Sequence, residues 1–216
     1  MFSNRGIFYF FFSFYLFLAS CRQETNRLRD TILKELTQQP GTFAVAFRDL
    51  SNGQQILIHE HEVFHAASTM KTPVMIEVFK QCAEGKYSLF DSVIVKNEFS
   101  SIVDGSAYSL NPSGDSEQDL YNRIGGKEVL SALVYKMIIA SSNLATNIVI
   151  DMIDAKAVTQ TMHELGAKDI RVLRGVEDTK AFVKGLNNTV TAYDLMVIYE
   201  KMANGEIVDQ KASQAM

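Results

Sequence analysis

Ser68 and Lys71 are the one serine and lysine in the sequence that stand three residues apart in that order. A helix over this segment would put both side chains on one face, so the lysine amine could reach the serine hydroxyl. A serine hydroxyl is a weak nucleophile until a neighbour takes its proton, and a lysine can do so when burial or charge lowers its pKa. The pair therefore predicts nucleophilic acyl transfer. Since roughly one such pair is expected by chance in a chain of this length, the prediction needs a second element.

The second element is Ser141-Ser142-Asn143, which follows an apolar helical run ending at Ala140, with Asn147 one turn later. Acyl transfer requires a nucleophile, a base, an acid for the leaving group and donors for the oxyanion. The alternative is that these residues only punctuate two helices, because Ser and Asn cap helices routinely. The presence of Ser68 upstream favours the functional interpretation.

Together the runs from His65 to Pro73 and from Ile139 to Asn147 resemble the class A β-lactamases and their relatives among the penicillin-recognising serine hydrolases. The resemblance implies an α+β fold of the β-lactamase/DD-peptidase type, with a helical lobe packed on an antiparallel sheet. No cofactor is expected, and no metal either, because His59, His61 and His65 have no second group of ligands elsewhere in the sequence. The resemblance also implies that Ser68 attacks the lactam carbonyl to form an acyl-enzyme and that Lys71 is its proton partner. Ser141 would relay a proton to the leaving nitrogen.

The same resemblance assigns four further residues. Asn143 would hold the amide side chain of the substrate, and Asn147 would brace the late loop. Glu177, within that loop, would activate the water that hydrolyses the acyl-enzyme. The alternative for Glu177 is an ordinary solvated carboxylate, in which case the acyl-enzyme would stall. Tyr108 would form a wall of the binding cleft.

The sequence departs from the family in three places. Ser142 stands where class A enzymes usually carry Asp, and Leu186-Asn187 comes nine residues after Glu177 where the family has the pair close by. No Lys-Thr-Gly or Lys-Ser-Gly triplet stands between the late helix and Met216, although in the family it lies on a strand that supplies an oxyanion donor. We therefore expect an incomplete coding sequence or a decayed gene, with the C-terminal strands missing.

These departures leave three functions open. The first is a serine enzyme that is acylated by β-lactams and hydrolyses them. The second uses the same serine on a peptidoglycan peptide, as a DD-peptidase, or on an ester. The third is a non-catalytic envelope lipoprotein or an inactive fragment that keeps the fold without the chemistry.

The elements that must position these residues follow from hydrophobic spacing and turn residues. A hairpin is expected around Asn52-Gly53, a dipeptide that accepts the positive φ angles of a tight turn. The order of helix, hairpin, helical block and late loop indicates a small sheet packed against helices. The expected helices are 24–38, 68–83, 118–124, 127–140, 144–153, 158–165 and 192–203; the expected extended runs are 42–48, 54–59, 92–96 and 170–173, and 100–118 and 174–188 are expected to be irregular.

The first 21 residues are typical of an export signal. Arg5 precedes an apolar run from Ile7 to Leu18 that is short for a bilayer span, and Leu18-Ala19-Ser20-Cys21 resembles a bacterial lipobox. We expect cleavage before Cys21, lipidation of Cys21, and a body of residues 22–216 held at the bacterial cell envelope, facing the periplasm or the exterior. The alternative is an uncleaved N-terminal anchor.

Composition narrows the partners. The chain has 216 residues, 47% of them hydrophobic and 21% charged, as in an ordinary globular protein of one domain. Its net charge of -4 comes without the clustered Lys and Arg that phosphate binding needs, so nucleic acid is not expected. We expect the protein to be a monomer and its partner to be a small molecule or a peptide.

Overall fold

The structure is a computed structural model, and it describes residues 24–216. The predicted export signal and Cys21 lie outside the described residues. The chain divides into two compact units, up to Glu62 and from Val63 onward, and each is described by itself. No helix within residues 24–216 is long and apolar enough to cross a membrane.

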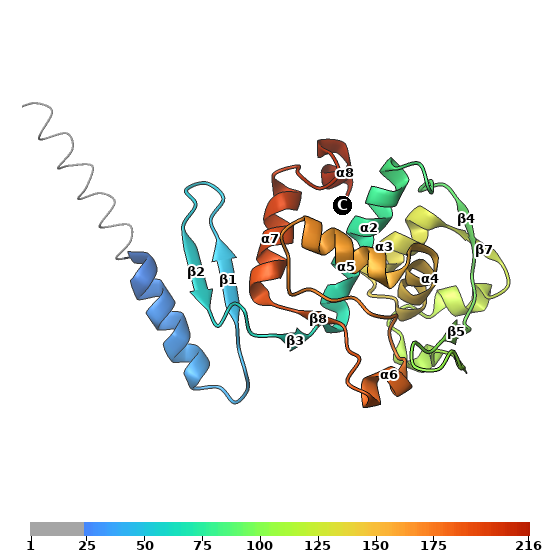
Figure 1. Cartoon of the computed structure of the whole chain (residues 1–216), viewed down its shortest axis with the longest axis horizontal. Coiled ribbons are helices and arrows are strands. Elements are labelled where there is room, and N and C mark those ends of the chain that lie inside the picture. The colour runs from blue at the N-terminus through green and yellow to red at the C-terminus, as the bar shows by residue number, and fades with distance from the viewer. Residues whose placement is uncertain (1–23) are drawn as a thin grey trace, which may run out of the picture. The chain divides into compact units, whose positions relative to one another are not determined.

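The first unit consists of a helix over residues 24–37 and a hairpin of β1 (Val45–Arg48) and β2 (Gln55–Ile58) (Figure 1). The strands pair antiparallel, and the turn between them contains Gly53 with a φ of 74°. The carboxylate of Asp49 accepts hydrogen bonds from the amide and hydroxyl of Ser51, which closes the turn. The predicted hairpin is confirmed, and its paired strands are shorter than the β-rich runs that predicted it.

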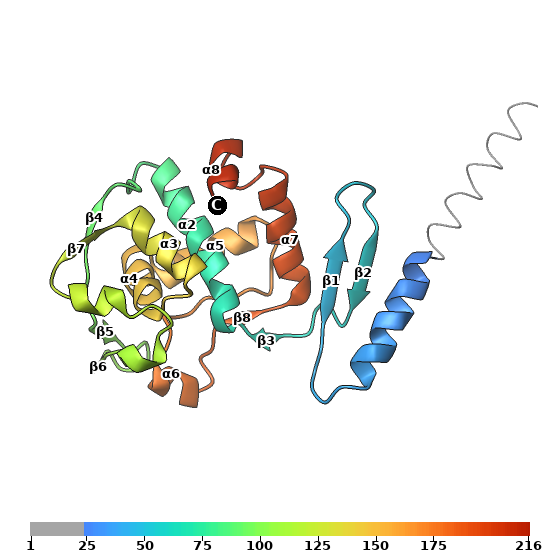
Figure 2. The same ribbon diagram turned by 180° about the vertical axis from the view of Figure 1, so that it is seen from behind.

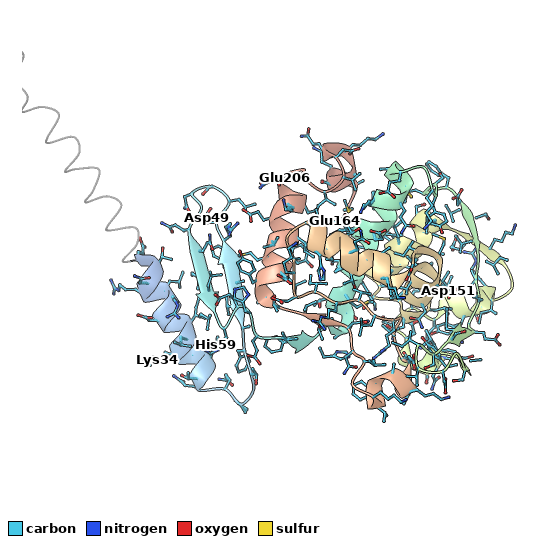
Figure 3. The ribbon with its side chains drawn as sticks, viewed as in Figure 1. Lys34, Asp49, His59, Asp151, Glu164 and Glu206 are labelled. Atoms are coloured by element: carbon cyan, nitrogen blue, oxygen red, sulfur yellow. The ribbon has the colours of Figure 1, made fainter. Side chains whose placement is uncertain are left out.

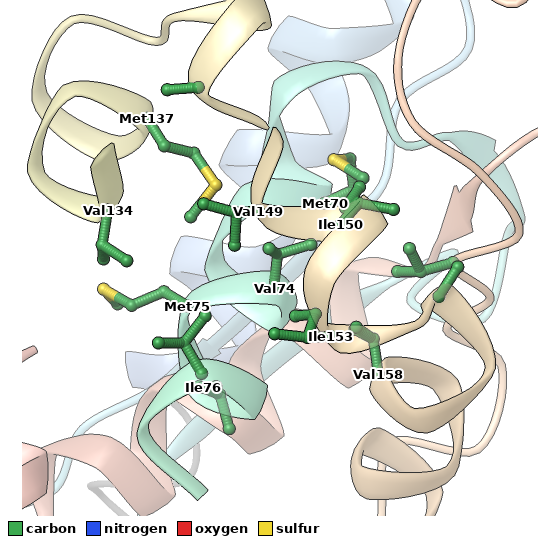
Figure 4. Packing of buried hydrophobic residues seen from close by; sticks show 14 of the residues in the cluster. Met70, Val74, Met75, Ile76, Val134, Met137, Val149, Ile150, Ile153 and Val158 are labelled. Atoms are coloured by element: carbon green, nitrogen blue, oxygen red, sulfur yellow. The ribbon is translucent and has the colours of Figure 1, made fainter. Parts of the chain in front are cut away.

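The core of the second unit is a helical cluster around α2 (Lys71–Ala83), which continues a 3-10 turn, η1 (Ala67–Met70). Helix α2 contacts α3 (Leu130–Ile139), α4 (Asn143–Ile153) and α5 (Ala155–Glu164), and both ribbon views show it among them (Figures 1 and 2). Each large apolar side chain buried here stabilises the fold by about 1.5–3 kcal/mol. The fully or almost fully buried side chains that meet in this core include Met70, Val74 and Ile76 of η1 and α2, Met137 of α3, Val149 and Ile153 of α4 and Val158 of α5 (Figure 4).

Three short antiparallel ladders tie the loops of the second unit to this core. They pair β3 (Phe64–His65) with β8 (Thr189–Val190), β4 (Ser92–Ile94) with β7 (Lys127–Val129), and β5 (Phe99–Ser100) with β6 (Ala107–Tyr108). The first ladder fixes the end of the late loop beside the segment that leads to Ser68. The amide of Ala66 adds a hydrogen bond of 2.8 Å to the carbonyl of Asn188.

The remaining elements are mostly short. Helix α7 (Ala192–Ala203) begins as predicted, because the hydroxyl of Thr191 accepts a hydrogen bond from the amide of Asp194. The others are η2 (Pro112–Gly114), η3 (Asp119–Arg123), α6 (Thr179–Val183) and α8 (Gln210–Ala215).

Several predicted elements were wrong in kind or extent. Residues 127–129, expected to open a helix, form β7 because they pair with Ser92–Ile94. Residues 119–123 form a 3-10 helix, and the strand expected at 170–173 is reduced to a single bridge between Arg171 and Thr189. The irregular stretches contain β6, η2 and α6, and α8 was not predicted.

Ion pairs on the surface contribute little to this fold. Lys80–Glu164 (2.8 Å), Lys96–Asp151 (2.5 Å) and Lys201–Glu206 (3.1 Å) join neighbouring segments, and Figure 3 labels their acidic partners. Exposed pairs of this kind are typically worth up to about 1 kcal/mol each. The apolar core, not these pairs, holds the helices together.

Candidate active site

Ser68 and Lys71 lie where η1 passes into α2. Their three-residue spacing on helical backbone puts both side chains on one side, and Lys71 Nζ donates to Ser68 Oγ at 3.2 Å. Ser68 is exposed, whereas Lys71 is only 2% exposed. The hydroxyl can therefore meet a ligand while the amine is shielded from water.

Lys71 also reaches the loop between α3 and α4. Its amine donates to Ser141 Oγ at 2.9 Å, to the Ser141 carbonyl at 2.6 Å and to Asn143 Oδ1 at 3.1 Å. The hydroxyl of Ser141 in turn donates to Ser68 Oγ at 3.0 Å. Ser68, Lys71 and Ser141 thus form a closed triangle of hydrogen bonds through which a proton can move.

The electrostatic setting of Lys71 favours proton transfer. Burial lowers the pKa of its amine, and the charges of Asp115 and Glu177 raise it by less, so the pKa lies below the usual value of a lysine. A larger fraction of the amine is therefore neutral near neutral pH than in a solvated lysine. A neutral amine can accept the proton of the Ser68 hydroxyl.

Ser141 has a left-handed backbone, with a φ of 53°. Such a conformation costs a residue other than glycine about 1–3 kcal/mol, so the surrounding contacts must hold it. Ser142, next in the chain, is fully buried and caps α4 by accepting a hydrogen bond from the amide of Ala145 at 3.2 Å. Ser142 thus serves as the N-terminal cap of α4.

Glu177 faces the same group of residues from the late loop. Asn143 Nδ2 donates to Glu177 Oε1 at 2.9 Å, while the oxygen of the same amide accepts from Lys71. Asn143 therefore bridges the lysine and the glutamate. Glu177 is exposed, so a water molecule can reach its carboxylate.

Asn147 holds the loop just before Glu177. It is 2% exposed, and its side chain pairs with the backbone of Val176, accepting from the amide at 2.6 Å and donating to the carbonyl at 3.0 Å. Gly175 passes so close that a Cβ there would lie 2.4 Å from Asn147 Oδ1. The hydroxyl of Tyr108 accepts from Asn147 Nδ2 and donates to the Val176 carbonyl, both at 3.3 Å.

Tyr108 takes part, through its hydroxyl, in the contact between Asn147 and Val176. Burial, with a smaller effect of Asp178, raises the pKa of Tyr108 to about 12, so the hydroxyl keeps the proton that it donates. Its ring packs against Phe99 with centroids 5.9 Å apart. That Tyr108 also forms a cleft wall stays a prediction.

The late loop is closed by residues that the sequence did not point to. Arg174 is 6% exposed, and its guanidinium donates to the carbonyls of Gly175 and Leu186, both at 2.9 Å. Asn188 joins the two ends of the loop: its Oδ1 accepts from the amide of Arg174 at 3.2 Å, and its Nδ2 donates to the carbonyl of Arg174 at 2.9 Å. In the sequence these residues look like ordinary loop polar residues.

Asp178 fastens the late loop to the 99–108 hairpin. Its carboxylate accepts from the hydroxyl of Ser101 at 2.9 Å and from the amides of Ile102 and Ala181 at 3.0 Å. Burial alone would raise the pKa of Asp178, but these hydrogen bonds lower it below its usual range. The loop that carries Glu177 is thus held from two directions.

The site occurs in a chain that matches a known protein family. The sequence profile of the beta-lactamase enzyme family matches residues 26–216, and the chain belongs to that family. Among proteins of curated function, no match was found.

Solved structures share the fold. The β-lactamase from Sphaerobacter thermophilus is 24% identical with a TM-score of 0.68, and the match covers 82% of this chain and 62% of that one. A variant of PBP-A, solved as an acyl-enzyme complex with penicillin G, is 26% identical with a TM-score of 0.69, covering 88% and 66%. The TLA-1 extended-spectrum β-lactamase is 18% identical with a TM-score of 0.72, covering 88% and 66%.

These matches confirm the predicted α+β fold of the β-lactamase/DD-peptidase type. The chain spans about two thirds of the length of each of these structures.

Proposed function

We propose that this protein is a serine hydrolase that forms an acyl-enzyme with β-lactams through Ser68 and hydrolyses it. The observation that carries the proposal is the position of the buried Lys71 amine, within hydrogen-bond distance of the hydroxyls of both Ser68 and Ser141. The acyl-enzyme complex of the PBP-A variant with penicillin G supports the choice of substrate class.

The acylation step uses the triangle of hydrogen bonds. Neutral Lys71 takes the proton of the Ser68 hydroxyl as Ser68 Oγ attacks the lactam carbonyl, and the amide C–N bond then breaks. The leaving nitrogen receives a proton from the hydroxyl of Ser141, which is replenished from the Lys71 ammonium. Lys71 returns to its neutral form, and the substrate remains as an ester of Ser68.

Hydrolysis of that ester requires a base for the attacking water. Glu177 fits this role, because it is exposed and is tied through Asn143 to Lys71. The water gives a proton to Glu177 as its oxygen attacks the ester carbonyl. The Ser68 oxygen then leaves and takes up the proton that Glu177 received, which regenerates both groups. Without this step the protein would trap β-lactams as a penicillin-binding protein does.

The test follows the mass of the intact chain with penicillin G, alongside Ser68→Ala and Glu177→Gln variants. The proposal expects an adduct of the mass of penicillin on the wild type and none on Ser68→Ala. It also expects drug turnover by the wild type and an adduct that persists at least about 100-fold longer on Glu177→Gln.

The outcomes separate the three functions. An adduct that persists on the wild type without turnover would replace hydrolysis by a peptidase or penicillin-binding role, and turnover of a peptidoglycan peptide or an ester would then identify the substrate. A folded wild type without adduct would overturn the proposal in favour of a non-catalytic protein.

We also propose that the protein is exported and held at the cell envelope by lipid on Cys21. The support is the sequence alone: Arg5, the apolar run after it and the lipobox-like segment before Cys21. Metabolic labelling with a palmitate analogue should mark the wild type and not a Cys21→Ala variant. An unlabelled wild type in the membrane fraction would instead indicate an uncleaved anchor.

A further inference from the structure

Three consecutive residues lie outside the triangle and beside the turn that carries Ser141. Asp115 and Ser116 bond the two sides of this turn, and Glu117 pairs with Lys136 of α3. Asp115 Oδ2 accepts from the amide of Leu144, after the turn, at 2.9 Å. The hydroxyl of Ser116 donates to the carbonyl of Ala140, before the turn.

Glu117 makes the third contact. Its carboxylate pairs with Lys136 Nζ at 2.7 Å, and the carbonyl of Lys136 accepts from the amide of Ser142 at 3.1 Å. The end of α3 and the start of α4 are thus both bonded to one segment of three residues.

Asp115 is the most constrained of the three. It is 4% exposed, and its carboxylate also accepts from the hydroxyl of Tyr121 at 3.0 Å and from the amide of Glu117 at 3.2 Å. A buried carboxylate with three such donors cannot turn away without leaving polar groups unsatisfied. Its position beside Leu144 is therefore fixed by the fold.

The turn needs such support because of what Ser141 does. With a φ of 53°, Ser141 directs both its carbonyl oxygen and its hydroxyl at Lys71 Nζ. A relaxed backbone would move both acceptors together. Fixing Ala140 on one side and Leu144 on the other leaves the turn no room to relax.

Asp115 also acts on Lys71 through its charge. Asp115 and Glu177 are the two carboxylates that attract the Lys71 amine, one from beside the first turn of α4 and one from the late loop. Removing the charge of Asp115 therefore lowers the pKa of Lys71, because one of the two charges that favour the ammonium is lost.

We propose that Asp115, Ser116 and Glu117 form a bracket that holds Ser141 against Lys71, and that Asp115 is a positioning residue for the acylation of Ser68. The effect of the bracket on acylation depends on the proposed function. Its effect on the conformation of the turn does not.

The first experiment tests the bracket without relying on activity. Ser116→Ala removes one exposed hydroxyl. Ser113→Ala removes another, which lies in η2 three residues earlier and donates to Asn111. Hydrogen exchange of the full-length chain is followed in peptides that cover 140–146. Exchange about fivefold faster in Ser116→Ala and unchanged in Ser113→Ala is expected. Unchanged exchange in a folded Ser116→Ala variant would overturn the bracket, whatever the acylation assay gives.

The second experiment separates positioning from mere stability. The rate of penicillin adduct formation is measured against pH for Asp115→Asn, with Asp119→Asn as an exposed control on the next element. Asp115→Asn should slow acylation about tenfold and move its rise with pH to lower pH, because neutral Lys71 is then populated earlier.

The possible outcomes are distinct. A slower Asp115→Asn variant whose pH profile does not move would contradict the positioning role. Absence of an adduct on the wild type itself would reject the proposed function, and the exchange experiment then decides the bracket alone. If Asp115→Asn does not fold, Ser116→Ala is carried through the same pH series, where slower acylation is expected and an unchanged rate would contradict the proposal.

Discussion

Gly175 gives the sharpest test of how the late loop is held. Its backbone does not need a glycine for its φ angle, but a Cβ at this position would lie 2.4 Å from Oδ1 and 2.8 Å from Cγ of Asn147. Both contacts are shorter than real Cβ atoms show. In Gly175→Ala either Asn147 or the loop must therefore move.

The size of the effect follows from what Asn147 bonds. A displaced side chain loses the hydrogen bonds to the amide and carbonyl of Val176, each worth about 1 kcal/mol net, and leaves buried polar groups unpaired at about 1–3 kcal/mol. Overpacking adds about 1–3 kcal/mol, and partial relaxation offsets some of the sum. We expect Gly175→Ala to lower the free energy of unfolding by about 2–4 kcal/mol.

Urea denaturation of the folded chain measures this change, with Gly114→Ala as the control. Gly114, the last residue of η2, also lacks a positive φ, and no atom lies within 4 Å of a Cβ built there. That variant should stay within about 0.5 kcal/mol of the wild type. Because Glu177 is two residues beyond Gly175, the hydrolysis of the penicillin adduct should also slow, by about 100-fold for a displacement of 1 Å.

A double variant identifies the cause. In an Asn147→Ala background the atoms that clash are gone, so Gly175→Ala should cost little beyond Asn147→Ala alone. Two results would refute the reasoning: a Gly175→Ala variant as stable as the wild type, or a full penalty that persists without the Asn147 side chain.

Four other outcomes are expected. Lys71→Arg should abolish adduct formation with penicillin in the intact-mass assay, because a guanidinium keeps its proton. In the wild type, the rate of adduct formation should rise with pH at values below the pKa of a free lysine, about 10.4, because burial lowers the pKa of Lys71. Thr191→Ala should lower the free energy of unfolding in urea by about 1 kcal/mol, since it removes the cap of α7. Asp178→Asn should lower the melting temperature at neutral pH. The pKa of Asp178 is lower in the folded protein than in the unfolded chain, where it is about 3.9. The stability that its charge contributes is therefore present above the unfolded pKa and is lost as the pH falls through the lower folded value. The melting temperatures of the wild type and Asp178→Asn should converge at that low pH.

The sequence determined those parts of the fold that depend on neighbours along the chain. The hairpin around Asn52-Gly53, helix α2 and the capped start of α7 are set by turn residues, apolar spacing and a threonine hydroxyl within a few residues. The short ladders were not predictable in this way. Strand β7, for example, exists because residues 127–129 meet β4, and nothing within three residues records such a partner.

The residues of the candidate site likewise divide into those recognisable from neighbours in the sequence and those that the tertiary structure brings together. Ser68 and Lys71 were recognisable because one helical turn brings their side chains together. That Ser141 and Glu177 join them, and that Asp115 and Asn188 support them, was decided by the packing of α2 against α4 and by hydrogen bonds between loops. Burial and mutual distance of residues far apart in the chain are properties of the packed molecule, and spacing in the sequence carries no direct measure of them.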